Sequence, residues 1–220
     1  ADRGAQVLKI EVPVAGDGYR NYAILPFTPN ADTNYTWAMD ARNKRSMALN
    51  LKSEQGIAIL HQLIRECDVY VTNQPLPLRR RLKLNYEDIQ PLNERMIYAS
   101  LTPYGEDGPD SENEAFDLVA YWNRSGLMDN MRHAGVEPVQ ALPGLGDHPT
   151  AVSMYAGIVT ALLQRARTGL GTKVHTSLMA NGLWSASCLA QGKLANADMS
   201  PYYPPTLTAA PHKAADGRRR

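Results

Sequence analysis

Apolar and polar residues follow two patterns along the chain, one typical of strands and one typical of helices. Buried strands are predicted by short apolar runs at residues 6–11, 69–71 and 96–101. After Ser53 the apolar residues recur at helical spacing, which predicts a helix that ends at Asp68. A short helix is predicted from Asn85 to about residue 92. Alternating strands and helices favour an α/β fold with a largely parallel sheet flanked by helices.

The C-terminal half continues with longer helical patterns. Helices are predicted at residues 116–128, 149–167 and 179–195, with a strand at residues 173–177. Residues 102–113 lack a period and carry glycine, proline and acidic residues, so we expect a surface loop beside a site. From residue 196 on, proline and small residues predict a linker or a frayed tail.

Composition and charge narrow the possible partners. The chain has 220 residues, 44% of them hydrophobic, which is enough for a sizeable core, and its formal net charge is +1. No global field would recruit a nucleic acid or a membrane surface, so we expect neither partner, and any anionic ligand must be held locally. Cys67 and Cys188 lie in helical patterns and are expected to be buried apolar residues, which suits the reducing cytoplasm.

Several kinds of catalytic site lack their usual spacing. The stretch "GLGDHP" begins like a dinucleotide fingerprint, but Pro149 stands where the third glycine would be. The chain contains no GxxxxGK[ST], GxSxG or HExxH motif, which argues against nucleotide hydrolysis, a serine hydrolase and a zincin. The five histidines are scattered, and neither cysteine lies near them in a metal-ligand spacing, so no metal site is predicted.

Asp147 is the remaining candidate for chemistry, and two interpretations are open. It comes directly before a strong helical pattern, where an aspartate is a common cap. The same position offers helix amides and a dipole that favour a carboxylate, and a carboxylate exposed to an electrophile can act as a covalent nucleophile. Gly144 and Gly146 would permit close approach of a substrate to the backbone.

A series of motifs follows in the order and spacing of one known family. These motifs are "VLKIEVPVAGDGYR", "ARNKRSMALNL", "DVYVTN", "NYEDIQPLNERMIYASLTPYG", "FDLVAYWNRSGLM" and "GLGDHPTAVSMYAGIVTALLQRARTGLGTKVHTSL". Through them the chain resembles the class III CoA-transferases, which include formyl-CoA and carnitine CoA-transferases and α-methylacyl-CoA racemase-like proteins. The resemblance implies a Rossmann-like large domain over about residues 1–195, with residues 196–220 as a linker and the start of a small domain.

The resemblance also implies roles for individual residues. Asp147 matches the catalytic aspartate, which forms an anhydride and then a thioester with CoA. Coenzyme A esters would be substrates, and no cofactor would be tightly bound. The positions that match CoA-contacting residues of the family are Arg20, Leu49, Asn73, Gln74, Arg81 and Leu82. Phe116 and Asp117 match an aromatic and acidic pair beside the acyl site.

Family members are about twice as long and form interlocked dimers, so the resemblance implies a chain truncated at both ends and a homodimer in the full-length form. Two other functions stay open at this point. A racemase of the same fold would use Asp147 with a histidine to move an α-proton, but the segment "FDLVAYWNRSGLM" contains no histidine. A non-catalytic CoA-binding remnant would keep the nucleotide contacts without the chemistry.

Overall fold

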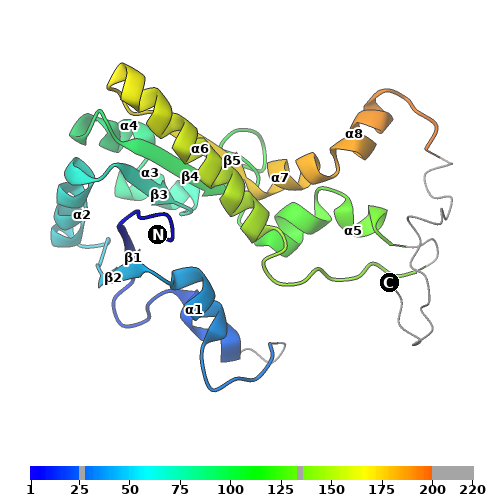
Figure 1. The fold of residues 1–220 in the computed structure, drawn as a ribbon, viewed down its shortest axis with the longest axis horizontal. Coiled ribbons are helices and arrows are strands. Elements are labelled where there is room, and N and C mark those ends of the chain that lie inside the picture. The colour runs from blue at the N-terminus through cyan, green and yellow to red at the C-terminus, as the bar shows by residue number, and fades with distance from the viewer. Residues whose placement is uncertain (25–27, 133–135, 200–220) are drawn as a thin grey trace. The chain divides into compact units, whose positions relative to one another are not determined.

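The computed structural model describes residues 1–24, 28–132 and 136–199, and Figure 1 shows its elements in chain order. The chain divides into two compact units. The first unit comprises Ala1–Ser100 and Ala156–Val174, and the second comprises Leu101–Tyr155 and the chain from His175 on. The predicted α/β class, with parallel strands flanked by helices, is confirmed, although the strands of the described residues form two sheets instead of one.

The smaller sheet pairs β1 (Val7–Glu11) in parallel with β2 (Lys44–Ala48), with Val7 opposite Lys44 and Glu11 opposite Ala48. The crossover between these strands contains the 3-10 helix η1 (Gly18–Ile24) and helix α1 (Tyr35–Ala41). The Asn34 side chain accepts a hydrogen bond from the Trp37 amide and so caps α1. Because the strands are parallel, Glu11 and the residue after Ala48 lie at the same, carboxyl edge of the sheet.

The larger sheet has the order β3 (Val69–Thr72), β4 (Ile97–Thr102) and β5 (Lys173–Ser177). β3 and β4 pair in parallel, with Val69 opposite Ile97. The central strand β4 is almost continuously buried, and Ile97, Tyr98, Ala99 and Ser100 are all 0% exposed. Such burial along successive residues is typical of a strand covered on both faces.

Helix α2 (Glu54–Glu66) confirms the predicted helix after Ser53 and anchors the core of the first unit. The Ser53 hydroxyl accepts the Gly56 amide as an N-cap, and Leu60 and Ile64 face inward. They pack with residues of β4 and of the connection before it. That connection contains the elements α3 (Leu76–Leu82), α4 (Tyr86–Ile89) and η2 (Gln90–Leu92). The sequence pattern predicted the last two elements as one short helix and missed both α1 and α3.

The second unit contains shorter helices than the sequence predicts. The expected helix at residues 116–128 is the π-helix η3 (Leu118–Asn123) followed by α5 (Leu127–Asn130), because Gly126 adopts a left-handed φ of 82° between them. The expected helix at residues 179–195 is divided at Ala186 into α7 (Leu178–Ser185) and α8 (Ser187–Leu194). Cys188 of α8 is exposed and Cys67 is half-buried, so the expectation that both cysteines are buried was wrong.

The longest helix is α6 (Asp147–Thr168), drawn in yellow tones in Figure 1. Pro149 lies in its first turn, where a helix does not use the amide hydrogen that proline lacks. One face carries large apolar side chains at helical spacing that are 45–67% exposed, namely Val152, Tyr155, Val159 and Leu163. Over the described residues, no helix combines the length and apolarity needed to cross a membrane.

Candidate active site and coenzyme-contact residues

In the turn before α6, Gly146 is buried within the second unit and Asp147 lies at its surface. Gly146 is buried, whereas the next residue, Asp147, is exposed as the first residue of the helix. The Gly146 amide donates a hydrogen bond to Oδ2 of Asp117 over 3.1 Å. The Gly146 carbonyl accepts a hydrogen bond from Oγ1 of Thr150 over 2.7 Å. Both polar groups of Gly146 are therefore held immediately before the candidate nucleophile.

Gly144 and Gly146 are glycines for different reasons. Gly144 has a left-handed φ of 79°, which favours glycine in the turn. Gly146 needs glycine for space, since a Cβ atom there would lie 2.6 Å from both Cβ and Cγ of Tyr121 and 2.9 Å from Cβ of Asp117. Both glycines were expected to permit close approach of a substrate, but at Gly146 the close neighbours are Tyr121 and Asp117 of the protein itself.

Asp117 and Tyr121, which meet Gly146, are fixed in turn by the π-helix and by α7. Asp117 is 7% exposed and Tyr121 is 6% exposed. The Tyr121 hydroxyl lies 2.7 Å from Oγ of Ser185, and its backbone carbonyl accepts the Ser125 hydroxyl. π-helices are rare in proteins, and those that occur are often found at functional sites. Phe116, by contrast, is 86% exposed, so the two residues that the family resemblance pairs have opposite surroundings.

Arg20 belongs to an ion-pair cluster at the carboxyl end of β1. Its Nε and Nη2 donate to the two oxygens of Glu11 over 2.6 and 2.8 Å, a bidentate arrangement. Glu11 is 6% exposed and also accepts the Ser46 hydroxyl and the Asp17 amide. The hydrogen bonds from Arg20 lower the pKa of Glu11 to about 2. The Arg20 guanidinium lies 4.0 Å from the centre of the Trp37 ring, so one of its faces is covered.

The other predicted coenzyme-contact residues lie at the ends of strands and in the core of the first unit. Leu49 follows β2, is 9% exposed, and donates its amide to the Glu11 carbonyl. Leu82, in the last turn of α3, packs against the same hydrophobic cluster. Asn73 and Gln74 follow the carboxyl end of β3, and Asn73 is exposed. The buried Oε1 of Gln74 has no hydrogen-bond partner among the described residues.

The three consecutive arginines of α3 have different surroundings. Arg79 is 1% exposed, and it donates from Nε to the Gln74 carbonyl and from Nη1 to the Tyr98 hydroxyl. Arg80 and Arg81 are exposed at the end of the helix. Arg79 therefore stabilises the segment that carries Gln74, whereas the guanidinium of Arg81 reaches solvent.

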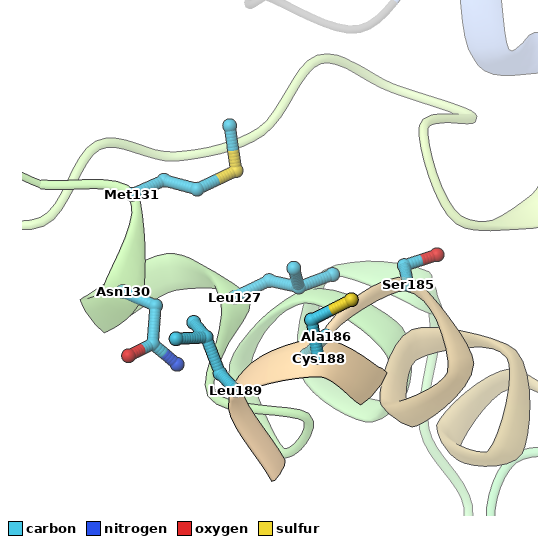
Figure 2. A pocket seen from close by; sticks show the side chains of 7 residues that line it. All are labelled: Leu127, Asn130, Met131, Ser185, Ala186, Cys188 and Leu189. Atoms are coloured by element: carbon cyan, nitrogen blue, oxygen red, sulfur yellow. The ribbon is translucent and has the colours of Figure 1, made fainter. Parts of the chain in front are cut away.

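A hollow of about 210 Å³ lies in the second unit and contains none of the predicted site residues. Figure 2 shows its lining side chains, which come from α5 and from the end of α7 and the start of α8. Most of them are apolar, including Leu127, Met131 and Leu189. No group of three or more histidine, cysteine or acidic side chains suited to a metal ion occurs in the part of the chain that the structure describes.

Sequence reasoning missed the residues that hold the candidate groups in place, namely Glu11, Trp37, Tyr121 and Thr150. Glu11 carries a usable signal, because an acidic residue at the end of an apolar strand must find a partner and "GDGYR" supplies one. Thr150 follows Gly146 by four residues inside a helix start, where a hydroxyl often bonds the carbonyl one turn back. Tyr121 carries no such signal, since its contact with Gly146 spans 25 residues of chain, from position 121 to position 146.

The Glu11 cluster predicts a specific acid sensitivity. Glu11 has a pKa of about 2 in the folded protein and an ordinary value of 4.5, so its pairing stabilises the fold fully above pH 4.5 and is lost as the pH falls toward 2. We expect Glu11→Gln to unfold more easily than the wild type at pH 7, with a difference that shrinks across this window. Urea denaturation at a series of pH values measures it. The exposed Glu66→Gln serves as the control, and a difference that does not change with pH would contradict the pairing.

The contact between Gly146 and Tyr121 predicts a penalty for any side chain at position 146. Gly146→Ala inserts a methyl group 2.6 Å from the Tyr121 side chain, and overpacking of this kind costs about 1–3 kcal/mol in the free energy of unfolding. Gly157→Ala within α6 is the matched control. The added Cβ atom there would lie 3.7 Å from its nearest neighbour, Cβ of Val174, and alanine favours a helix over glycine by about 0.5–1 kcal/mol. Equal stability of the two variants in chemical denaturation would count against the packed turn.

Comparison with known proteins identifies the family. The model of CoA-transferase family III matches residues 1–217. The cinnamoyl-CoA:phenyllactate CoA-transferase of Clostridium sporogenes is 36% identical over 192 residues, which cover 87% of this chain and 46% of the relative. The succinyl-CoA:glutarate CoA-transferase of Mus musculus is 36% identical over 190 residues, covering 86% of this chain and 42% of the relative.

A solved structure agrees with these sequence matches. The crystal structure of a CAIB/BAIF family protein from Brucella suis has a TM-score of 0.82 and 27% identity to this chain, and the match covers 97% of this chain and 57% of that one. The chain spans less than half the length of the two curated relatives above. The matches to the family model, to the relatives and to the solved structure agree, and the chain belongs to CoA-transferase family III.

Proposed function

We propose that this protein transfers CoA from an acyl-CoA to a free carboxylic acid, with Asp147 as the covalent nucleophile. The observation that carries the proposal is the position of Asp147, exposed at the start of a 22-residue helix on a turn whose preceding residue is buried and hydrogen-bonded on both sides. The positive end of the helix dipole favours a negative charge there. The names of the relatives, which are CoA-transferases for different acids, support the reaction class.

The first half of the cycle loads CoA onto the protein. A carboxylate oxygen of Asp147 attacks the thioester carbon of the donor, the carbon–sulfur bond breaks, and CoA leaves as a thiolate while a mixed anhydride forms. The thiolate then attacks the side-chain carbonyl carbon of Asp147. The donor acid leaves as a carboxylate that carries the bridging oxygen, and Asp147 becomes a thioester of CoA.

The second half transfers CoA to the acceptor. An oxygen of the acceptor carboxylate attacks the Asp147 thioester, CoA leaves as a thiolate, and a second anhydride forms. The thiolate attacks the acyl carbon of the acceptor, which gives the new acyl-CoA and returns Asp147 to a carboxylate. Each step exchanges one leaving group for one nucleophile, so the cycle needs no oxidant, no reductant and no tightly bound cofactor.

CoA recognition is proposed for the residues of the first unit. Arg20 is held by Glu11 and covered on one face by Trp37, which preorganises its guanidinium for a phosphate oxygen. The exposed guanidinium of Arg81 supplies a second positive charge for the diphosphate. The buried Oε1 of Gln74 is an acceptor that suits an N–H donor of the ligand, and Asn73, Leu49 and Leu82 complete the proposed contact set.

Homodimer formation is part of the proposal. The exposed apolar face of α6, formed by Val152, Tyr155, Val159 and Leu163, is the kind of surface that a protein partner covers. We assign that partner to a second copy of the protein, because the family resemblance implies a dimer.

The test is to trap the intermediate on Asp147. The protein is incubated with several acyl-CoA donors and then with hydroxylamine, which converts anhydrides and thioesters of a carboxylate to a hydroxamate, and the modified peptide is mapped by mass spectrometry. We expect a donor-dependent hydroxamate on Asp147 in the wild type and none in Asp147→Asn. Asp129→Asn, which changes an exposed aspartate of α5, is the control and is expected to behave as the wild type.

Two outcomes would contradict the proposal. A wild-type protein that binds CoA but forms no hydroxamate with any donor is a remnant or a racemase, and exchange of the acyl α-proton with deuterated water separates these two. A hydroxamate on a residue other than Asp147 would leave the reaction class intact and overturn the assignment of the nucleophile.

A further inference from the structure

We propose that Asp117 positions Asp147 for reaction and does not itself contact the substrate. This inference rests on the proposed function and changes the role that the family resemblance gives to Asp117. The resemblance implies that Asp117 and Phe116 lie together beside the acyl site, but only Phe116 is exposed. The Asp117 carboxylate is 7% exposed, and one of its oxygens accepts the Gly146 amide.

The role follows from the freedom that a glycine gives its neighbour. Gly146 has no side chain, so rotation about its backbone bonds is restricted less than in any other residue, and such rotation would swing Asp147. The peptide before Gly146 is held by Asp117, which accepts its N–H at 3.1 Å. The peptide after Gly146 is held by Thr150, whose hydroxyl donates to its carbonyl at 2.7 Å and whose amide donates to it at 3.2 Å. With both peptides fixed, the direction of the Asp147 side chain from the backbone is fixed as well.

Packing of the Tyr121 side chain further restricts movement of Gly146. The Tyr121 side chain lies against the Cα of Gly146, so closely that an added Cβ would be 2.6 Å from it. Tyr121 is held in turn by the hydroxyl of Ser185 at 2.7 Å. Asp117 and Tyr121 both belong to the segment around the π-helix η3, so this segment supports the turn through one hydrogen bond and one packing contact.

The proposed reaction requires that the Asp147 side chain be held in a fixed position. Carboxylate attack on a thioester requires a near-attack geometry, and a displacement of about 1 Å can cost about 100-fold in rate. The Asp147 side chain also exchanges the group bonded to it in each of the four steps of the proposed cycle. Its carbonyl carbon must therefore occupy the same position at every step. The function assigned to Asp117 is to accept a hydrogen bond, which does not require its negative charge.

Two substitutions separate this role from substrate contact. Asp117→Asn keeps a carbonyl oxygen that can accept the Gly146 amide, whereas Asp117→Ala leaves that buried amide without an acceptor. With saturating acyl-CoA, we measure the rate constant for formation of the hydroxylamine-trapped adduct on Asp147, together with the Kd for CoA. We expect Asp117→Ala to lower the rate constant about 10- to 100-fold and Asp117→Asn to stay within about 3-fold of the wild type. Neither variant should change the Kd of CoA.

Thr150→Val provides an independent test that leaves Asp117 in place. It removes the Thr150 hydroxyl as a donor to the Gly146 carbonyl, keeps the 3.2 Å hydrogen bond from the Thr150 amide, and preserves the shape of a side chain that is 0% exposed. We expect a lower rate constant with an unchanged Kd, and a smaller loss than in Asp117→Ala because the Thr150 amide still donates to the Gly146 carbonyl. This variant keeps the inference testable if Asp117→Ala does not fold.

The results that overturn the inference differ from those that overturn the proposed function. If Asp117→Asn loses as much activity as Asp117→Ala, the negative charge is required, and Asp117 acts on the substrate. If Asp117→Ala folds and reacts like the wild type, the hydrogen bond to Gly146 has no role in the reaction. If the wild type itself forms no adduct on Asp147, the proposed function fails before Asp117 is tested.

Discussion

Gly146 stands directly before Asp147, the proposed nucleophile, and three contacts restrict the backbone freedom that a glycine would otherwise have there. Asp117 holds the amide of Gly146, Thr150 holds its carbonyl, and Tyr121 packs against its Cα. The buried carboxylate needs a donor and the buried amide needs an acceptor, so each group satisfies the other. Helix α6 can then begin at Asp147, which is exposed, directly after a turn whose backbone is held in place. The proposed chemistry depends on this separation between a fixed backbone and an accessible side chain.

In the first unit, a buried residue likewise holds a side chain that is proposed to contact the ligand, the cationic Arg20. Glu11 is buried at the end of β1, and it orients Arg20 through two short hydrogen bonds while Trp37 covers one guanidinium face. Arg79 is buried as well and holds the backbone of Gln74. In the first unit, the buried Glu11 and Arg79 hold Arg20 and Gln74, which are residues proposed to meet the ligand. In the second unit, the buried Asp117 holds Gly146, the residue directly before the proposed nucleophile Asp147. Preorganisation of this kind lowers the entropy lost when a substrate binds.

The sequence predicted the elements that have a clear period and missed the contacts that join distant segments. The helix after Ser53 and the helix beginning near Asp147 were both predicted from spacing and capping, because these signals are local. The helix expected at residues 116–128 is broken, since Gly126 turns left-handed where the apolar pattern continues. The placement of Asp117 beside the acyl site followed from the family resemblance alone. Its hydrogen bond to Gly146 depends on a tertiary contact that no local pattern encodes.

In the proposed cycle, the Asp147 carboxylate forms and breaks covalent bonds during each turnover. The most direct test supplies an acceptor acid whose carboxylate carries a heavy oxygen isotope and maps the protein by mass spectrometry after a single turnover. The proposed cycle leaves one acceptor oxygen in the regenerated carboxylate, so the peptide with Asp147 should gain one heavy oxygen only when donor and acceptor are both present. Formation of the new acyl-CoA with an unlabelled Asp147 would contradict the account, because CoA would then have moved without an aspartyl intermediate.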